Sequence, residues 1–172
     1  MGRARQGRRL EVAQPDGEGV GTVFVTAPPF GRWEYWRNSE RTAEAWRGDA
    51  FTAGDVGRLD AGGYLYLTSR REDLIITGGV NVYPAEVERV LLEHPAVRDV
   101  VVFGVADPQW GQRVCDAAVA DGATSSQLMA WARERLDPAR RPKELRLVDS
   151  LPRTSTGKVD RGTLRRGSGQ PG

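Results

Sequence analysis

Cysteine and histidine each occur only once among the 172 residues. The single thiol, Cys115, excludes an internal disulfide, and the mostly apolar run 114–120 around it predicts that it packs as a small hydrophobic side chain. The only histidine, His94, precedes Pro95 at the expected end of a helix, and no other histidine or cysteine lies near it in the sequence. We therefore expect no metal site and no histidine that acts as a general base.

Long apolar runs are also missing. None approaches the roughly 20 residues that a membrane-spanning helix needs, and the first residues lack the apolar core of a secretory signal. The net charge is only +2, although basic residues gather between 140 and 166. No aromatic residue interleaves that segment, which favours a solvated surface or one facing a small anion over a nucleic-acid surface. We expect a cytoplasmic protein without a membrane span or a nucleic-acid partner.

Lysine is scarce for a chain with so many cations. Only Lys143 and Lys158 are present among the 25 basic residues, and all the others are arginines. The ammonium group is a compact point charge on a flexible stem, whereas the guanidinium is a planar fork. A lysine in a chain that otherwise uses arginine indicates a site that needs one ammonium among oxygen atoms. The alternative is that the two lysines occur by chance.

The stretch 68–88 separates two different parts of the chain. Its first half places four charged residues, 70–73, between the alternating run 64–67 and the apolar run 74–76. Four unpaired charges are costly to bury, so this segment is predicted to lie on a surface. Gly78 and Gly79 follow, and they allow a sharp turn or a close approach of the backbone to a ligand. Pro84 then begins a predicted helix.

Asp55 stands between Gly54 and Gly57 and between two predicted strands. An ionised carboxylate only accepts hydrogen bonds, so an acid held out in this way suits the two hydroxyl groups of a diol. The alternative is an Asx turn with a purely structural role.

The last patterned segment is 151–159, L-P-R-T-S-T-G-K-V. It is rich in hydroxyl groups and glycine, which predicts a mobile loop that presents Lys158. A Walker A phosphate loop is excluded by spacing, because Pro152 and Val159 stand where that loop needs glycine and serine or threonine.

These three segments together resemble the superfamily of AMP-forming acyl-CoA synthetases, peptide-synthetase adenylation domains and luciferases. Residues 69–88 are similar to its core motif, G-R-x-(D/K)-x-x-I-x-x-x-G-x-x-(I/V)-x-P-x-E-(I/V)-E, with Ser69 in place of the usual glycine and Glu72 in place of Asp or Lys. Residues 51–55 resemble the (Y/F)-(R/K)-T-G-D motif at the Gly-Asp end only. Residues 151–159 match the closing motif L-P-(R/K)-T-x-x-G-K-(V/I).

The resemblance implies a role for each matched residue. Asp55 would bind the ribose hydroxyls of ATP or AMP, and Arg70 would make a second ribose or phosphate contact. Glu72 would be the hinge about which the small domain turns. The Gly78-Gly79 loop would line the pantetheine channel of CoA, and Lys158 would be the catalytic lysine that reaches the acyl carboxylate and the α-phosphate during adenylation.

The resemblance also implies an α+β fold and a division of the chain. Residues 1–68 would be a mainly β remnant of the large AMP-binding domain, 69–73 the hinge, 74–166 the small C-terminal domain and 167–172 a disordered tail. We expect 1–19 to be a frayed arm and a helix to lie within 39–46, capped by Asn38 or Ser39. The small domain should have a three-stranded sheet, a hairpin over 75–82, and helices over 84–93 and 127–136.

The upstream family segments that hold the triphosphate, adenine and magnesium are not found. The chain is therefore expected to be the C-terminal portion of an acid–CoA ligase that uses ATP, a carboxylic acid and CoA, and to be inactive alone. Magnesium would be bound by the missing part, and an N-terminal domain could be supplied in trans. Two alternatives remain open, a non-catalytic partner or interaction module and the remnant of a truncated gene.

Overall fold

A computed structural model describes residues 2–4, 7–29 and 31–168. The chain divides into two compact units, Met1–Glu72 and Asp73–Gly172, and each is described by itself. The boundary falls inside the charged segment 70–73.

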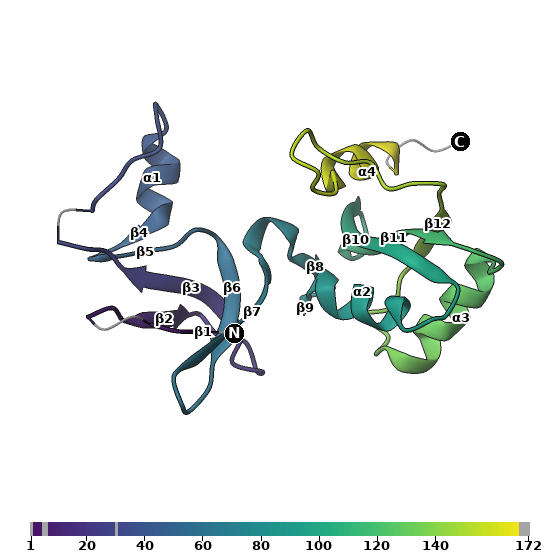
Figure 1. Cartoon of the computed structure of the whole chain (residues 1–172), viewed down its shortest axis with the longest axis horizontal. Helices are drawn as coiled ribbons and strands as arrows, with labels where there is room; N and C mark the ends of the chain where they lie inside the picture. The colour runs from purple at the N-terminus through teal and green to yellow at the C-terminus, as the bar shows by residue number, and fades with distance from the viewer. Residues whose placement is uncertain (1, 5–6, 30, 169–172) are drawn as a thin grey trace. The chain divides into compact units, whose positions relative to one another are not determined.

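The first unit is a seven-stranded sheet with one short helix (Figure 1). The strand order is β1-β7-β6-β3-β5-β4, and β2 pairs with β3 outside this path. The elements are β1 (Gly2–Arg3), β2 (Leu10–Ala13), β3 (Gly21–Thr26), α1 (Ser39–Ala45), β4 (Trp46–Arg47), β5 (Ala50–Phe51), β6 (Asp55–Leu59) and β7 (Tyr64–Arg70).

The expectation of a frayed arm over 1–19 is wrong for β2. This strand pairs antiparallel with β3, with Leu10 opposite Val25 and Ala13 opposite Thr22. The connecting turn is closed by Asp16, whose Oδ1 accepts hydrogen bonds from the backbone N–H groups of Glu18 and Val20. Four residues are too few to show a clear alternating pattern, so the neighbouring strand rather than local propensity decides this element.

The helix predicted within 39–46 is α1, and its cap is Asn38. The Asn38 side chain accepts a hydrogen bond from the backbone N–H of Arg41 at 2.9 Å, which satisfies one of the unpaired donors of the first turn. Among the residues of this unit that the structure describes, one buried apolar cluster forms, with Ala13, Phe24 and Ala50. Leu67 on β7 is 59% exposed, so the unit leaves apolar surface uncovered.

The second unit has the α+β architecture that the sequence predicts. Its elements are β8 (Ile75–Thr77), β9 (Val80–Val82), α2 (Pro84–Leu92), β10 (Val97–Asp107), β11 (Gly111–Ala120), α3 (Ser125–Arg135), β12 (Glu144–Leu147) and α4 (Arg161–Gly167). Strands β10 and β11 pair antiparallel and β12 runs parallel to β11, which gives the expected three-stranded sheet. The β8–β9 hairpin joins this sheet through the pair Gly111 and Thr77, which makes five strands in all.

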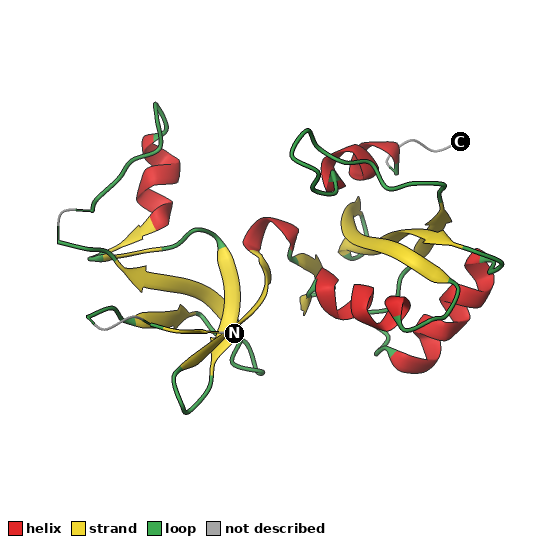
Figure 2. Ribbon diagram, viewed as in Figure 1, coloured by secondary structure: helices red, strands yellow, loops and turns green. Residues whose placement is uncertain are grey.

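The sheet of the second unit separates two buried clusters. Helices α2 and α3 lie on one face of this sheet and α4 lies on the other (Figure 2). Alternate residues of β10 and β11 face α2 and α3, where the larger cluster includes Leu91, Leu128 and Leu145. The opposite face carries Phe103 and Cys115 and is covered by residues from 148 onwards, including Leu164 of α4. Both faces of these two strands are covered, so residues pointing to either side are buried. Both strands therefore read as nearly continuous apolar runs.

Helix α3 begins at a different residue from the one predicted, and helix α4 was not among the predicted helices. Helix α3 begins at Ser125, two residues earlier than expected, because Thr124 and Gln127 form a reciprocal capping box. Helix α4 was not predicted at all. Its cap is Asp160, whose carboxylate accepts hydrogen bonds from the hydroxyl and the backbone N–H of Thr163. These bonds lower the pKa of Asp160. The sequence signal for the start of α4 is an Asp followed three residues later by threonine.

Replacing Leu128 by alanine tests whether this side chain belongs to the core of the second unit. Leu128 is fully buried in the larger cluster, so Leu128→Ala is expected to lower the free energy of unfolding by about 2 to 5 kcal/mol. Leu147 on β12 is 43% exposed, and Leu147→Ala should change it by less than about 0.5 kcal/mol. Urea titration followed by circular dichroism measures both, and equal effects would contradict this assignment.

Candidate functional site

Asp55 and Arg70 lie opposite each other on neighbouring strands. Asp55 begins β6 and Arg70 ends β7, and the two residues are direct partners in the antiparallel register. The Arg70 Nε is 2.8 Å from Asp55 Oδ1, and its Nη1 donates to the Ala53 carbonyl at 3.0 Å. The guanidinium therefore orients the carboxylate and ties it to the loop before β6. Within the described residues, Asp55 Oδ2 accepts no hydrogen bond, and this oxygen can accept one from a ligand.

The loop before β6 is held by bonds that the sequence did not reveal. The Thr52 side chain is buried, and its hydroxyl accepts the Gly54 N–H at 3.0 Å. The Gly54 carbonyl in turn accepts the Arg71 N–H at 2.7 Å. Gly54 has φ +82°, which a residue with a Cβ rarely adopts. The residue that departs from the family pattern, Thr52, thus fixes the conformation that presents Asp55.

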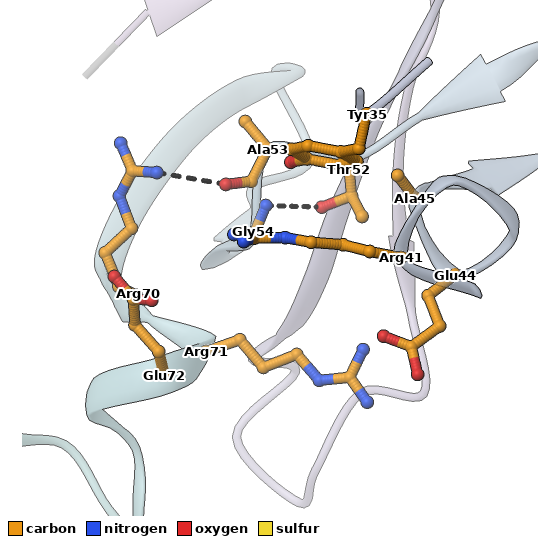
Figure 3. Close-up of a pocket in the computed structure, with 10 residues that line it drawn as sticks. All are labelled: Tyr35, Arg41, Glu44, Ala45, Thr52, Ala53, Gly54, Arg70, Arg71 and Glu72. Atoms are coloured by element: carbon orange, nitrogen blue, oxygen red, sulfur yellow. Dashed lines mark hydrogen bonds between the residues drawn. The ribbon is translucent and has the colours of Figure 1, made fainter. Parts of the chain in front are cut away.

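A cavity of about 460 Å³ lies beside this loop in the first unit (Figure 3). Helix α1, the loop 52–54 and the end of β7 form its walls, and the Arg41 guanidinium lies 4.6 Å from the centre of the Tyr35 ring. Its charged lining residues are Arg41, Glu44, Arg70, Arg71 and Glu72. Three arginines and two glutamates leave this lining with a net positive charge, which is compatible with a polar or anionic ligand.

The junction is anchored on each side of Glu72. On one side, Arg71 donates its N–H to Gly54 within the first unit. On the other side, Asp73 lies 3.6 Å from Arg161 and 3.7 Å from Arg165 within the second unit. A single turn of 3-10 helix, Arg71–Asp73, spans the two anchors. Glu72 is therefore the residue between two fixed points, as a hinge residue would be.

The two glycines of the hairpin adopt conformations that require glycine. Gly78 and Gly79 have φ +56° and +81°, and they form the two-residue turn between the paired residues Thr77 and Val80. A Cβ on Gly78 would lie 3.0 Å from the Trp110 ring. The Gly78 N–H donates to the Trp110 carbonyl at 2.9 Å. The turn is thus fixed in shape, with the Trp110 ring against Gly78 and open space beside Gly79.

Lys158 stands on a hydrogen-bonded turn rather than an irregular loop. The Thr154 N–H donates to the Lys158 carbonyl at 2.7 Å, and Arg153 forms an antiparallel bridge with Val159. The Arg153 guanidinium donates to the Gly157 carbonyl and pairs with Asp99 at 2.9 Å. Lys158 itself is exposed. Within residues 2–4, 7–29 and 31–168, its ammonium has no hydrogen bond or ion pair, so its charge is available to a ligand.

Glu88 has a structural role that sequence reasoning did not assign. Its Oε1 accepts the Val102 N–H at 3.0 Å and an Arg161 N–H at 2.8 Å. These two bonds connect α2 with β10 and with the start of α4. The Glu88 side chain is only 18% exposed, so both bonds are partly shielded from water. The only sequence signal for this role was the P-x-E-V-E motif that ends at Glu88. The preference for acids in the first turns of a helix accounted for that motif equally well.

The prediction that Cys115 packs as a small hydrophobic side chain is confirmed. Cys115 is buried, and burial raises the pKa of its thiol to about 11, which keeps it neutral. The His94 ring packs edge-on against Trp131, and its Nδ1 accepts the Ala96 N–H at 3.2 Å.

In the described parts of the chain, no group of three or more His, Cys, Asp or Glu could hold a metal ion. None of the described helices is long and apolar enough to cross a membrane.

The chain thus combines a β unit that ends in an acid–arginine pair with an α+β unit that carries a diglycine hairpin and a lysine turn. Residues 86–158 match the model of the AMP-binding enzyme C-terminal domain. The second unit of the chain therefore carries the AMP-binding enzyme C-terminal domain.

Individual relatives agree with this family. The chain is 47% identical to the 2-succinylbenzoate–CoA ligase of Geobacillus kaustophilus over 153 residues, which are 86% of the chain and 30% of the relative. It is 41% identical to a feruloyl-CoA synthase of Amycolatopsis over 166 residues, which are 91% of the chain and 33% of the relative. The structure of ATP-bound MatB from Rhodopseudomonas palustris superposes with a TM-score of 0.84 at 34% identity, covering 96% of the chain and 35% of MatB. The chain thus spans about a third of the length of the relatives it matches.

Proposed function

We propose that this chain supplies the C-terminal portion of an AMP-forming acid–CoA ligase. The observation that carries the proposal is the exposed ammonium of Lys158, which no described residue neutralises although arginine serves almost everywhere else in the chain. The motif around it lies in the family-matched segment.

The reaction has two steps, and this chain contributes to both. In the first, the acid's carboxylate oxygen attacks the α-phosphorus of ATP, and the bond to the bridging oxygen breaks to release pyrophosphate. Lys158 donates hydrogen bonds to the oxygens that carry the negative charge in that transition state. In the second, the CoA thiol loses its proton and attacks the acyl carbon, and AMP leaves with the bonding electron pair.

Asp55 and Arg70 hold the nucleotide in this proposal. The open Asp55 oxygen accepts a hydrogen bond from a ribose hydroxyl, and the carboxylate keeps its orientation because Arg70 binds the other oxygen at 2.8 Å. The Arg70 Nη2 remains for a second ribose or phosphate oxygen. The arrangement costs little reorganisation when the ligand binds, since the pair is already formed.

The Gly78-Gly79 turn lines the path of pantetheine. A thin, flexible chain such as pantetheine needs a close-lying backbone, and both glycines present one without a Cβ. In this proposal the second unit turns about Glu72 between the two steps, which exchanges Lys158 for the diglycine turn at the reacting centre.

The remaining parts of the enzyme lie outside this chain. Magnesium supports ATP chemistry of this type, but the described residues include no group of three or more carboxylate or imidazole ligands for it. We therefore assign the metal and the acyl pocket to the part that the relatives carry beyond their matched third, joined in cis or supplied in trans, and place the enzyme in the cytoplasm.

Binding of AMP to the chain tests the nucleotide site directly. Asp55→Asn removes the charge but keeps the shape, and it is expected to weaken AMP binding by about tenfold or more, because hydrogen bonds to a charged group are lost. Asp49→Asn is the matched control, since Asp49 is an exposed acid of the same unit paired with Arg9. Titration calorimetry measures both. Equal affinities for the two variants would remove Asp55 from the site.

A further inference from the structure

Asp116 is a carboxyl group in the middle of an apolar core. It lies on β11, with Val102 of β10 opposite on one side and Leu145 of β12 opposite on the other. Its relative exposure is 0%. It shares its sheet face with Val114 and Ala118, which belong to the larger buried cluster of the second unit.

Neither oxygen of Asp116 is satisfied. Among the described residues, neither Oδ1 nor Oδ2 has a hydrogen-bond partner. Most buried polar atoms are paired, so an orphaned pair of oxygens requires an explanation. A neutral carboxyl in this place costs far less than an ionised one, because a charge in an apolar medium loses its hydration without compensation.

The charged groups near Asp116 do not offset its charge. The facing acid is Glu88 of α2, and Arg161 at the start of α4 donates to Glu88 at 2.8 Å. Arg161 also contacts Asp73. The cluster residues contributed by α3 and β8 are apolar, among them Leu128 and Ile75. Burial first, and the charge of Glu88 second, raise the pKa of Asp116 well above its usual range.

We propose that Asp116 is a proton-binding site inside the second unit, and that loss of this proton opens the sheet formed by β10, β11 and β12. The folded unit holds Asp116 neutral, whereas the opened unit exposes it to water as an ordinary carboxylate. The proton thus acts as a ligand that binds the folded form more tightly than the opened form.

The sign of the pH dependence follows from this linkage. Below the ordinary carboxyl pKa of about 3.9, both forms are protonated and Asp116 contributes no pH dependence. Above it, the folded form holds one more proton than the opened form, so the folding equilibrium constant falls by about tenfold per pH unit. The fall stops at the pKa of the folded form. The second unit is therefore less stable at higher pH on account of this group.

Cys115, the neighbour of Asp116 on β11, is a natural probe of this opening. Its thiol is buried on the opposite face of the sheet and is 1% exposed, so a thiol reagent reacts only after the sheet opens. The measurement is the rate of Cys115 modification by a maleimide in the full chain and in Asp116→Ala, compared at each pH so that thiol ionisation cancels. We expect the ratio of the two rates to rise by up to about tenfold per pH unit from about pH 5 upwards.

Two further variants make the result decisive. Asp116→Asn retains the volume and a polar group but cannot ionise, so its rate relative to Asp116→Ala should stay constant with pH. Glu134→Gln removes an acid whose side chain is 72% exposed on α3, and it should behave as the unmodified chain does. A rate ratio between the unmodified chain and Asp116→Asn that stays constant between about pH 5 and about pH 8 overturns the proposal.

Discussion

Replacing Lys158 by alanine in the complete enzyme is expected to slow acyl-adenylate formation by about 100-fold or more, the effect of losing one donor to a transition-state charge. The complete enzyme is this chain joined to, or complemented by, the part that its relatives carry and it lacks. The reason lies in the turn that carries the lysine. Its backbone is held by Thr154 and Arg153, whereas the ammonium has no partner in the described residues, so alanine removes the charge without disturbing the turn.

The loss should be confined to one step. Thioester formation from supplied acyl-adenylate and CoA should stay within about twofold of the unmodified rate, because we propose that this step uses the diglycine turn instead. Single-turnover measurements of the two half-reactions separate them. An equal loss in both would mean that Lys158 supports the fold and not the adenylation chemistry.

Two controls sharpen this test. Lys158→Arg keeps the charge but replaces the compact ammonium by a wide, rigid fork, so adenylation should recover only in part. Lys143→Ala removes the other lysine of the chain, which lies 5.9 Å from the centre of the Trp110 ring, and should leave adenylation unaffected. A matching loss for Lys143→Ala would indicate a general effect of positive charge.

Replacing Glu72 by proline is expected to have the opposite selectivity. Proline fixes its own φ near −65° and disfavours the helical conformation of the residue before it. Glu72 lies between Arg71, bonded to Gly54, and Asp73, paired with Arg161, so the change restricts the link between two anchored points. Thioester formation should fall by about 100-fold, the cost of reacting groups held out of position, while adenylation stays near its normal rate.

Glu72→Ala is the matched control for the proline variant. It removes the same carboxylate but leaves φ free, so both half-reactions should proceed at nearly normal rates. Rapid-quench assays of each step distinguish the cases. If the alanine variant loses thioester formation as severely as the proline variant, the carboxylate and not backbone rotation is what the second step needs.

Much of the second unit could be predicted because its signals are local. The diglycine turn of the β8–β9 hairpin needs two positive φ angles, and only glycine adopts these readily. Pro84 marks the start of α2 for a similar reason, since its ring presets a helical φ. The first unit was harder, because β2 is a short strand whose existence depends on its partner β3.

The candidate site was predicted in its residues but not in its geometry. Sequence patterns selected Asp55 and Arg70 separately, one as a diol acceptor and the other through the family motif. They gave no indication that the two side chains bind each other, or that Thr52 secures the loop before Asp55. The roles of these residues in catalysis remain proposals that the variants above test.

The resemblance to the adenylating enzymes, the order of the motifs and most of the α+β unit could be predicted without a structure, because turns, caps and alternating strands depend on residues close together in the chain. Which distant side chains meet became clear from the folded chain alone. Glu88 and Arg161 are 73 positions apart, and Asp116 reads as an ordinary polar residue until β10, β12 and α2 surround it. Burial and pairing are properties of strand register and helix packing, and a residue's energetic cost is set by these neighbours rather than by its place in the sequence.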